Sequence, residues 1–245
     1  MRNLSALRRV DPVGKIEGNV PENMTTQPTA SPQSADHKTL LAATDLASVR
    51  GERTLFADLN MHVRAGEVWQ IEGPNGAGKS SLLRILTGLL APQAGQIQFR
   101  GEPIQNCREA FHAELLFIGH KAGVKAELTA IENLEFYAAV QGQPISAPPY
   151  ELLEKVGLVG LEDIPAQRLS AGQQRRIALA RLWLTDAPLW ILDEPFTALD
   201  VSGIALLEAR FAEHVAAGGA IILTSHQAVN SAHFPLQRVQ LRYQY

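Results

Sequence analysis

The sequence predicts an α/β fold built on a parallel β-sheet with helices on both of its faces. Nearly continuous runs of apolar residues, such as Leu189–Leu192 and Ala220–Thr224, are typical of strands that are buried on both sides. Segments with apolar residues at helical spacing alternate with these runs. A glycine-rich segment, Gly73–Ser81, lies between one such strand and one such helix. With 245 residues, 46% of them hydrophobic, the chain is long enough for one large α/β domain or two small ones.

Charge, cysteine content and hydropathy argue against three classes of protein: nucleic-acid binders, disulfide-bonded proteins and membrane-spanning proteins. A net charge of −3 gives no support for a nucleic-acid binder held by bulk charge. The single cysteine, Cys107, excludes an internal disulfide and fits a reducing compartment. No run of about 18 apolar residues occurs, so we expect no membrane-spanning segment. If the protein serves a membrane process, the membrane component must be another chain.

Residues 1–38 differ in composition from the rest of the chain. They are rich in Pro, Ser, Thr, Gln and Asn and contain few large apolar side chains. Such a segment cannot bury enough surface to offset its ordering entropy, and it lacks the apolar region of a signal peptide. We therefore expect a disordered N-terminal extension over 1–38 and a folded domain over 39–245.

The first elements expected after residue 38 are strands. Three segments alternate apolar and polar residues as half-buried strands do: Leu40–Arg50, Thr54–Val63 and Gln96–Arg100. In the last of these, Ile97 and Phe99 are expected to point inward. Glu67–Glu72 is expected to be a short buried strand that ends at the glycine-rich segment. Lys79–Leu90 then shows the apolar spacing of a helix.

The second half of the chain continues the alternation of strands and helices. Its expected elements are a strand at Glu114–Gly119, helices from Thr129 to about Val156, a helix at Gly172–Leu184, the strand Leu189–Leu192, a helix within Gly203–Val215 and a last core strand at Ala220–Thr224. The segment of about 120–172 is mostly helical. We interpret it as a subdomain inserted into the sheet domain. Phe136 and Tyr137 are expected to pack in its core, and the alternative is that they face a membrane partner.

The segment Gly73–Ser80 fits the pattern G-x-x-x-x-G-K-[ST] without a gap. Its glycines let the backbone wrap around phosphate groups with N–H groups pointing inward. Lys79 is expected to reach the β- and γ-phosphates, and the Ser80 hydroxyl to bind Mg²⁺. The segment therefore predicts an ATP and magnesium site. The residues expected to form its cradle are Gly73, Pro74, Asn75, Gly76, Ala77, Gly78, Lys79, Ser80 and Ser81.

Two other strand ends carry polar groups. The run LWILDEP places Asp193 at the carboxyl edge of the sheet, where it would hold Mg²⁺, and Glu194 next to it, where it would orient the attacking water. His226 ends the strand in LTSH, and we assign it to the γ-phosphate and to that water. A carboxylate pair can also belong to a simple turn, and a lone histidine is more often structural. The glycine cradle favours catalytic roles for both.

The stretch LSAGQQRRIALARLW, Leu169–Trp183, predicts a second anion site. A helix opened by small polar residues presents unpaired N–H groups, here those of Gly172 and Gln173 beside the Ser170 hydroxyl. We expect Arg175 and Arg176, further along this helix, to form a solvated face.

The motifs GPNGAGKS, LSAGQ, LWILDEP and TSH, in this order, resemble those of the ATP-binding-cassette ATPases. The resemblance extends from about Leu40 to Gln227, and Thr197–Asp200 matches the D-loop of that family. It implies a P-loop NTPase (RecA-like) core with an N-terminal antiparallel β subdomain and an inserted α-helical subdomain. It also implies a head-to-tail homodimer, in which each ATP lies between one chain's P-loop and the partner's signature residues. The signature residues are Ser170, Ala171, Gly172 and Gln173.

Three positions depart from the usual family pattern. His120 occupies the place of a glutamine that touches Mg²⁺ in most members, and Arg50 occupies the place of an aromatic residue that stacks on adenine. A guanidinium can stack on a base, although a solvated surface arginine fits equally well. Ala171 replaces a second glycine of the signature, and we expect its backbone to be ordinary.

Within the family, the segments Arg53–Phe56 and Gly119–Tyr137 are similar to those of the ATP-binding subunit of bacterial cytochrome c maturation systems. This resemblance implies an ATPase that works in haem export or in releasing haem from its chaperone complex. It implies integral membrane partners and a peripheral location on the cytoplasmic face of the inner membrane. No C-x-x-C-H motif is present, so we expect no direct haem site. The slightly acidic net charge is the reason that we expect no nucleic-acid partner. The alternatives are the ATPase of a drug or lipid exporter and, less favoured, a soluble cassette without a transport role.

Overall fold

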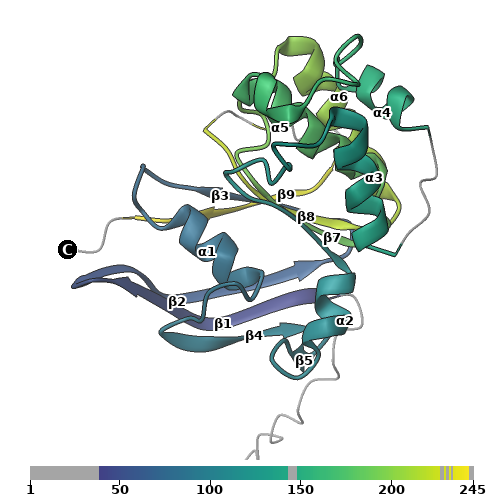
Figure 1. The fold of residues 1–245 in the computed structure, drawn as a ribbon. Helices are drawn as coiled ribbons and strands as arrows, with labels where there is room; N and C mark the ends of the chain where they lie inside the picture. Colours follow the sequence, from purple (N-terminus) through teal and green to yellow (C-terminus); the bar gives the residue numbers. More distant parts are fainter. Residues whose placement is uncertain (1–38, 143–147, 227–228, 230–231, 233, 243–245) are drawn as a thin grey trace, which may run out of the picture. The chain divides into compact units, whose positions relative to one another are not determined.

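Two β-sheets organise the described part of the chain (Figure 1). The computed structural model describes residues 39–142, 148–226, 229, 232 and 234–242. The extension predicted over 1–38 lies outside these residues. A four-stranded sheet has the order β2-β1-β4-β5, and a five-stranded sheet has the order β6-β7-β8-β3-β9.

The four-stranded sheet is antiparallel and is made by the N-terminal segments. Its strands are β1 (Thr39–Arg50), β2 (Arg53–Arg64), β4 (Ala94–Phe99) and β5 (Glu102–Pro103). β1 and β2 form a hairpin in which Arg50 pairs with Arg53. Ile97 and Phe99 are buried, as their alternation with polar residues predicts. The antiparallel β subdomain implied by the family resemblance is therefore present.

Every neighbouring pair in the five-stranded sheet is parallel, as the aliphatic strands predict. Its strands are β6 (Leu115–Ile118), β7 (Leu189–Asp193), β8 (Ala220–Thr224), β3 (Val68–Glu72) and β9 (Leu236–Gln240). The sequence predicts Ala220–Thr224, now β8, as the last strand of the sheet. The structure contains one more strand, β9, which pairs with β3 at the edge of the sheet. The residues of β9 are exposed or half-buried, so its hydrophobic pattern is weak.

Alternate side chains of the parallel sheet enter two separate cores. Leu189 and Ile191 face the antiparallel sheet and α1 (Lys79–Leu86), which packs between the two sheets. Trp190 and Leu192 face α5 (Ala171–Ala180) and α6 (Val201–Ala216) on the other side. This arrangement buries the strands on both faces, which explains their continuous aliphatic sequences.

Helix α1 ends at Leu86, four residues before the predicted end at Leu90. Gly88 has a φ of 71°, a left-handed conformation that ends a helix readily at glycine. Leu89 and Leu90 lie beyond this stop, with exposed fractions of 56% and 37%. The structure also contains a short helix over Arg108–Ala113, α2, that the sequence pattern does not predict.

The helical insert has a third hydrophobic core. It contains α3 (Ala130–Val140) and α4 (Pro149–Lys155), and α5 completes the core with Ile177 and Ala180. Tyr137 packs in the insert as expected, and the Arg181 guanidinium lies 3.9 Å from its ring centroid. The same prediction is wrong for Phe136, which is 45% exposed. Among the described residues, no helix combines the length and apolar character that crossing a membrane requires.

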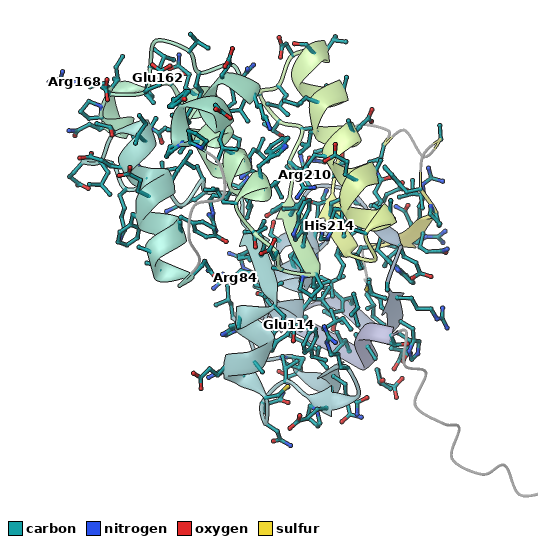
Figure 2. All side chains as sticks on the ribbon, turned by 90° about the vertical axis from the view of Figure 1, so that its right-hand side faces the viewer. Arg84, Glu114, Glu162, Arg168, Arg210 and His214 are labelled. Carbon is teal, nitrogen blue, oxygen red and sulfur yellow. The ribbon has the colours of Figure 1, made fainter. Side chains whose placement is uncertain are left out.

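His214 lies on α6, near Arg210 (Figure 2). Its ring is buried against that of Trp190, with ring centroids 3.6 Å apart and nearly parallel planes. Burial, and secondarily the neighbouring charge of Arg210, lowers the pKa of His214 from 6.5 to about 4. Between these values the unfolded chain binds a proton that the folded chain does not, so this group makes stability fall as the pH decreases. We expect the free energy of unfolding to lose up to about 3 kcal/mol between pH 6.5 and pH 4.

Urea unfolding of wild type and His214→Phe across this range measures the effect. The phenylalanine would keep an aromatic ring against Trp190 without a titrating nitrogen, so the stability profile of this variant should be flatter by that amount. His62→Gln, which changes an exposed histidine on β2, is the control. Equal slopes for wild type and His214→Phe would contradict the prediction.

Candidate functional site

A cavity of about 490 Å³ lies where the parallel strands β3, β7 and β8 end. The loop between β3 and α1, with the start of that helix, contributes six of the predicted cradle residues to its wall: Asn75, Gly76, Gly78, Lys79, Ser80 and Ser81. The ends of β7 and β8 contribute Asp193, Glu194 and His226. Parallel strands bring their carboxyl ends to one edge of a sheet, so residues far apart in sequence meet there. The remaining cradle residues, Gly73, Pro74 and Ala77, do not line the cavity, and Ala77 is buried in the core.

The loop from Gly73 to Gly78 depends on glycine at two close approaches. Gly73 has a φ of 148°, and a Cβ there would lie 2.7 Å from the carbonyl oxygen of Leu241. Gly78 has a φ of 102°, and a Cβ there would lie 3.0 Å from the Cβ of Leu55. A larger residue at either position would be strained and crowded, so the loop path is set by the sequence.

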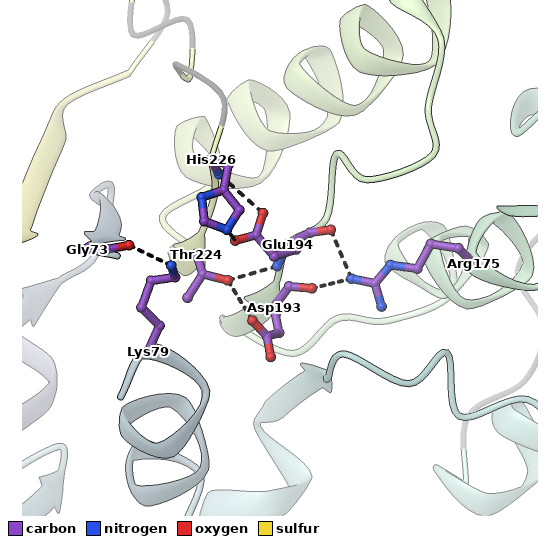
Figure 3. Close-up of polar contacts among 7 residues, drawn as sticks. All are labelled: Gly73, Lys79, Arg175, Asp193, Glu194, Thr224 and His226. Atoms are coloured by element: carbon purple, nitrogen blue, oxygen red, sulfur yellow. Dashed lines mark hydrogen bonds and ion pairs between the residues drawn. The ribbon is translucent and has the colours of Figure 1, made fainter. Parts of the chain in front are cut away.

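Lys79 begins α1 and places its ammonium group at the cavity. The residue is only 9% exposed, and its Nζ donates a hydrogen bond to the carbonyl of Gly73 over 2.7 Å (Figure 3). The described structure contains no ion pair between Lys79 and a carboxylate. Its positive charge is therefore available to an anion in the cavity, next to the unpaired N–H groups that open a helix.

Thr224 fixes both carboxylate residues from the neighbouring strand. Asp193 pairs with Thr224 in the register of β7 and β8. The Thr224 hydroxyl donates to Asp193 Oδ1 over 2.7 Å and accepts the Glu194 N–H over 2.8 Å (Figure 3). Thr224 is fully buried. Sequence reasoning misses this role, because a threonine at a strand end has no distinctive signal.

Glu194 and His226 are adjacent, as predicted. The His226 backbone N–H donates to Glu194 Oε2 over 3.2 Å, and His226 Nε2 lies 3.4 Å from Glu194 Oε1. Glu194 Oε1 is buried and accepts no hydrogen bond from the described residues. The backbone of Glu194 is left-handed, with a φ of 51°, which costs about 1–2 kcal/mol for a residue with a Cβ. A strained carboxylate that lines the cavity is suited to holding a water molecule there.

Arg175 is part of this site and not of a solvated helix face, so that expectation is wrong. The residue is 6% exposed. Its guanidinium donates to the carbonyls of Gly119, over 2.6 Å, and of Asp193. Burial lowers the pKa of Arg175, while the nearby charges of Asp193 and Glu194 raise it.

Arg176, by contrast, is half-buried and bonds to the Val156 carbonyl and to Asp200. The sequence pattern of an amphipathic helix does not reveal that one of two adjacent arginines points inward.

The residues Ser170–Gln173 open α5 and do not line the cavity. Ser170 caps the helix: its Oγ accepts the Gln173 N–H over 3.2 Å, and Gln173 Oε1 accepts the Ser170 N–H over 2.8 Å. Of the two amides expected to bind an anion, that of Gln173 is thus already bonded to Ser170. The conformation of Ala171 is helical and ordinary, as expected.

Ser80 and Asp193 offer a hydroxyl and a carboxylate to the same cavity, which suits Mg²⁺. In the described part of the chain, no group of three or more His, Cys, Asp and Glu side chains could hold a metal ion. Magnesium usually takes one or two protein ligands and completes its shell with phosphate and water, so these two donors fit a nucleotide-bound ion. His120 and Arg50 also line the cavity, so the residues at both unusual positions face the predicted nucleotide site.

We expect Thr224→Val to weaken catalysis more than ATP binding. The substitution keeps the shape but leaves the Glu194 N–H and Asp193 Oδ1 without their partner, which should cost about 1–3 kcal/mol of stability and misplace both carboxylates. Steady-state ATPase kinetics should show a kcat about tenfold lower with little change in KM. Thr185→Val is the matched control, because the buried Thr185 hydroxyl accepts only a local N–H, from Ala187. A kcat equal to that of Thr185→Val would contradict the role of Thr224.

Comparisons with known proteins agree with the family resemblance of the sequence. The profile of the family described as "ABC transporter" matches residues 56–197. The cytochrome c biogenesis ATP-binding export protein CcmA of Idiomarina loihiensis is 54% identical over 205 residues, which cover 83% of this chain and 93% of that protein. The protein of the same name from Vibrio cholerae is 51% identical over 203 residues, 82% of this chain and 98% of that protein.

Solved structures show the same fold. An ATP-binding subunit of an ABC transporter superposes with a TM-score of 0.73 and 28% identity, over 83% of this chain and 86% of that one. A dimeric ATP-binding cassette solved in a post-hydrolysis state with ADP and phosphate superposes with a TM-score of 0.71 and 22% identity, over 83% and 94% of the two chains.

Proposed function

The chain belongs to the ABC transporter family of ATP-binding proteins, and from this premise we propose that it is the ATPase subunit of a membrane complex for cytochrome c biogenesis. The observation that carries the proposal is a single cavity that unites the glycine loop, Lys79, Asp193, Glu194 and His226. Relatives at 51–54% identity that are named cytochrome c biogenesis ATP-binding export proteins favour this complex over a drug or lipid exporter.

The described side chains support separate roles in ATP hydrolysis. The loop amides and Lys79 bind the phosphates. Ser80 and Asp193 would hold Mg²⁺, which would neutralise charge on the transferring phosphoryl group. Glu194 accepts the proton of the attacking water, and His226, whose Nε2 lies 3.4 Å from Glu194 Oε1, orients the carboxylate and the γ-phosphate. Thr224 and Arg175 both bond to the backbone of Glu194, so both help to position its carboxylate.

We propose that the functional form is a head-to-tail dimer. The turn Ser170–Gln173 is accessible and does not line its own chain's cavity, so it is free to contact a nucleotide held by a second copy. Ser170 would have to exchange its bond with Gln173 for one with a phosphate oxygen. The dimer would then close around its two ATP sites only when nucleotide is bound.

The helical insert offers a surface for an integral membrane partner. A groove of about 270 Å³ runs between α3 and the loop at Gly123–Val124. Phe136 and Val140, 45% and 65% exposed, flank it and give it an apolar rim. Such a partner would place the protein peripherally on the cytoplasmic face of the bacterial inner membrane. Haem would then be handled by partner subunits, in export or in release from its chaperone complex.

Complementation tests this proposal. A bacterial strain without its own cytochrome c biogenesis ATPase should recover covalently bound haem in c-type cytochromes when it expresses this chain. Expression of Glu194→Gln should not restore it. Recovery of drug or lipid efflux in a strain that lacks such an exporter, without recovery of c-type cytochromes, would favour the alternative cargo and contradict the proposal.

A further inference from the structure

Arg175 lies in the second turn of α5 and joins two loops that carry site residues. Its Nη1 donates to the Gly119 carbonyl, at the end of β6, and Gly119 precedes His120 in the cavity wall. Its Nη2 donates to the carbonyls of Asp193 and of Glu194, the latter over 3.3 Å (Figure 3). Lys79 and Arg175 therefore approach the two catalytic carboxylate residues from opposite sides.

The contacts of Arg175 indicate a positioning function. A buried cation is costly unless it satisfies several partners, and an apolar side chain would fill the same space without that cost. All three acceptors of Arg175 are backbone carbonyls, so the guanidinium fixes the paths of both loops and leaves the carboxylate oxygens to the cavity. One of these carbonyls belongs to Glu194, whose left-handed backbone persists only if its surroundings hold it.

The same helix begins with the signature turn, Ser170–Gln173. Ser170 and Arg175 are five residues apart, about 7.5 Å along the helix axis. The close packing of Gly172 on Ala198 connects this end of α5 to the loop after Glu194. A Cβ at Gly172 would lie only 3.3 Å from that of Ala198. A shift of the signature turn therefore moves both Arg175 and the loop after Glu194.

We infer that Arg175 transmits nucleotide engagement between the two ATP sites of the dimer. This inference rests on the proposed head-to-tail function. The signature turn of each chain contacts the nucleotide of its partner, whereas Arg175 of the same helix holds Glu194 in that chain's own site. Closure of the turn on one γ-phosphate thus orders the catalytic base of the other site. Arg175 is a positioning residue and touches neither nucleotide.

ATPase titrations of the full chain in its membrane complex test this role with Arg175→Gln. We expect the Kd for a fluorescent ATP analogue to stay within about twofold, kcat to fall about 10- to 100-fold, and the Hill coefficient for ATP to fall from above 1 to about 1. Arg175→Lys keeps the charge and should give intermediate values, and it replaces the Gln variant if that variant melts below the assay temperature. Arg210→Gln is the control, because Arg210 also bonds a backbone carbonyl, that of Leu182, but does not contact the site.

A double variant separates transmission from mere structural support. If Arg175 acts on the same path as the signature turn, Ser170→Ala combined with Arg175→Gln should lower kcat no more than the stronger single variant. Multiplicative losses, or a folded Arg175→Gln with wild-type kcat and Hill coefficient, would overturn the inference and leave the proposed function intact. Wild type that fails to hydrolyse ATP would instead reject the proposed function.

Discussion

Glu194→Gln is expected to bind ATP normally and to stop hydrolysing it. The amide keeps the shape of the side chain but cannot accept the proton of the attacking water. Losing a general base lowers kcat by about 10²- to 10⁴-fold. The Thr224 and Arg175 contacts are to the backbone of Glu194, so they survive the substitution and preserve the loop.

The measurement combines single-turnover hydrolysis with size-exclusion chromatography in ATP and magnesium. The variant should accumulate as a nucleotide-bound dimer, because closure no longer leads to product release. Glu213→Gln, an exposed change on α6, should leave both the rate and the monomer–dimer balance at wild-type values. If Glu194→Gln hydrolysed ATP at the rate of this control, Glu194 could not be the general base.

Lys79→Met is expected to lose nucleotide affinity itself. Methionine keeps an unbranched apolar stem in a position that is only 9% exposed, but it removes the ammonium that points to the cavity. Truncating one partner of a buried charge contact typically costs about 2–4 kcal/mol, or roughly 30- to 1,000-fold in Kd. Because α1 begins at this residue, its unpaired amides should still supply some residual affinity.

Isothermal titration of ATP at fixed magnesium gives this Kd directly. Lys155→Met, which changes an exposed lysine on α4, is the matched control and should bind as wild type does. Thermal unfolding without nucleotide should show whether the loop remains folded. A Kd within about threefold of the control would show that Lys79 does not contact the phosphates.

The parts of the fold and site that depend on local pattern could be predicted from the sequence. The aliphatic runs of β7 and β8 and the glycine loop before α1 each carry a signal within a few residues. Parallel topology then brings Asp193 and His226 to the same edge. These residues line one cavity because their strands are neighbours in the sheet. The family resemblance implies this strand order, and the structure contains it.

The parts that depend on tertiary contacts could not be predicted. Arg175 and Arg176 are neighbours in a basic stretch, and only the packing of α5 against β6 and β7 makes one of them a buried ligand of carbonyls. Thr224 gains its role from register with Asp193, and β9 is too exposed to show a strand pattern. The left-handed Glu194 likewise has no sequence signature, since glutamate avoids that conformation elsewhere.

The pairing of β9 with β3 has a practical consequence for anyone who shortens or tags this chain. Leu241 contacts the residues at the start of the loop from Gly73 to Gly78. Its N–H donates to the Glu72 carbonyl over 2.8 Å, and its own carbonyl lies against Gly73. Deleting the residues from Leu236 onward would bare a flank of β3 that is prone to intermolecular pairing and would release the first residue of that loop. Truncation within residues 1–38, which precede the first strand, keeps every residue of this pairing in the chain.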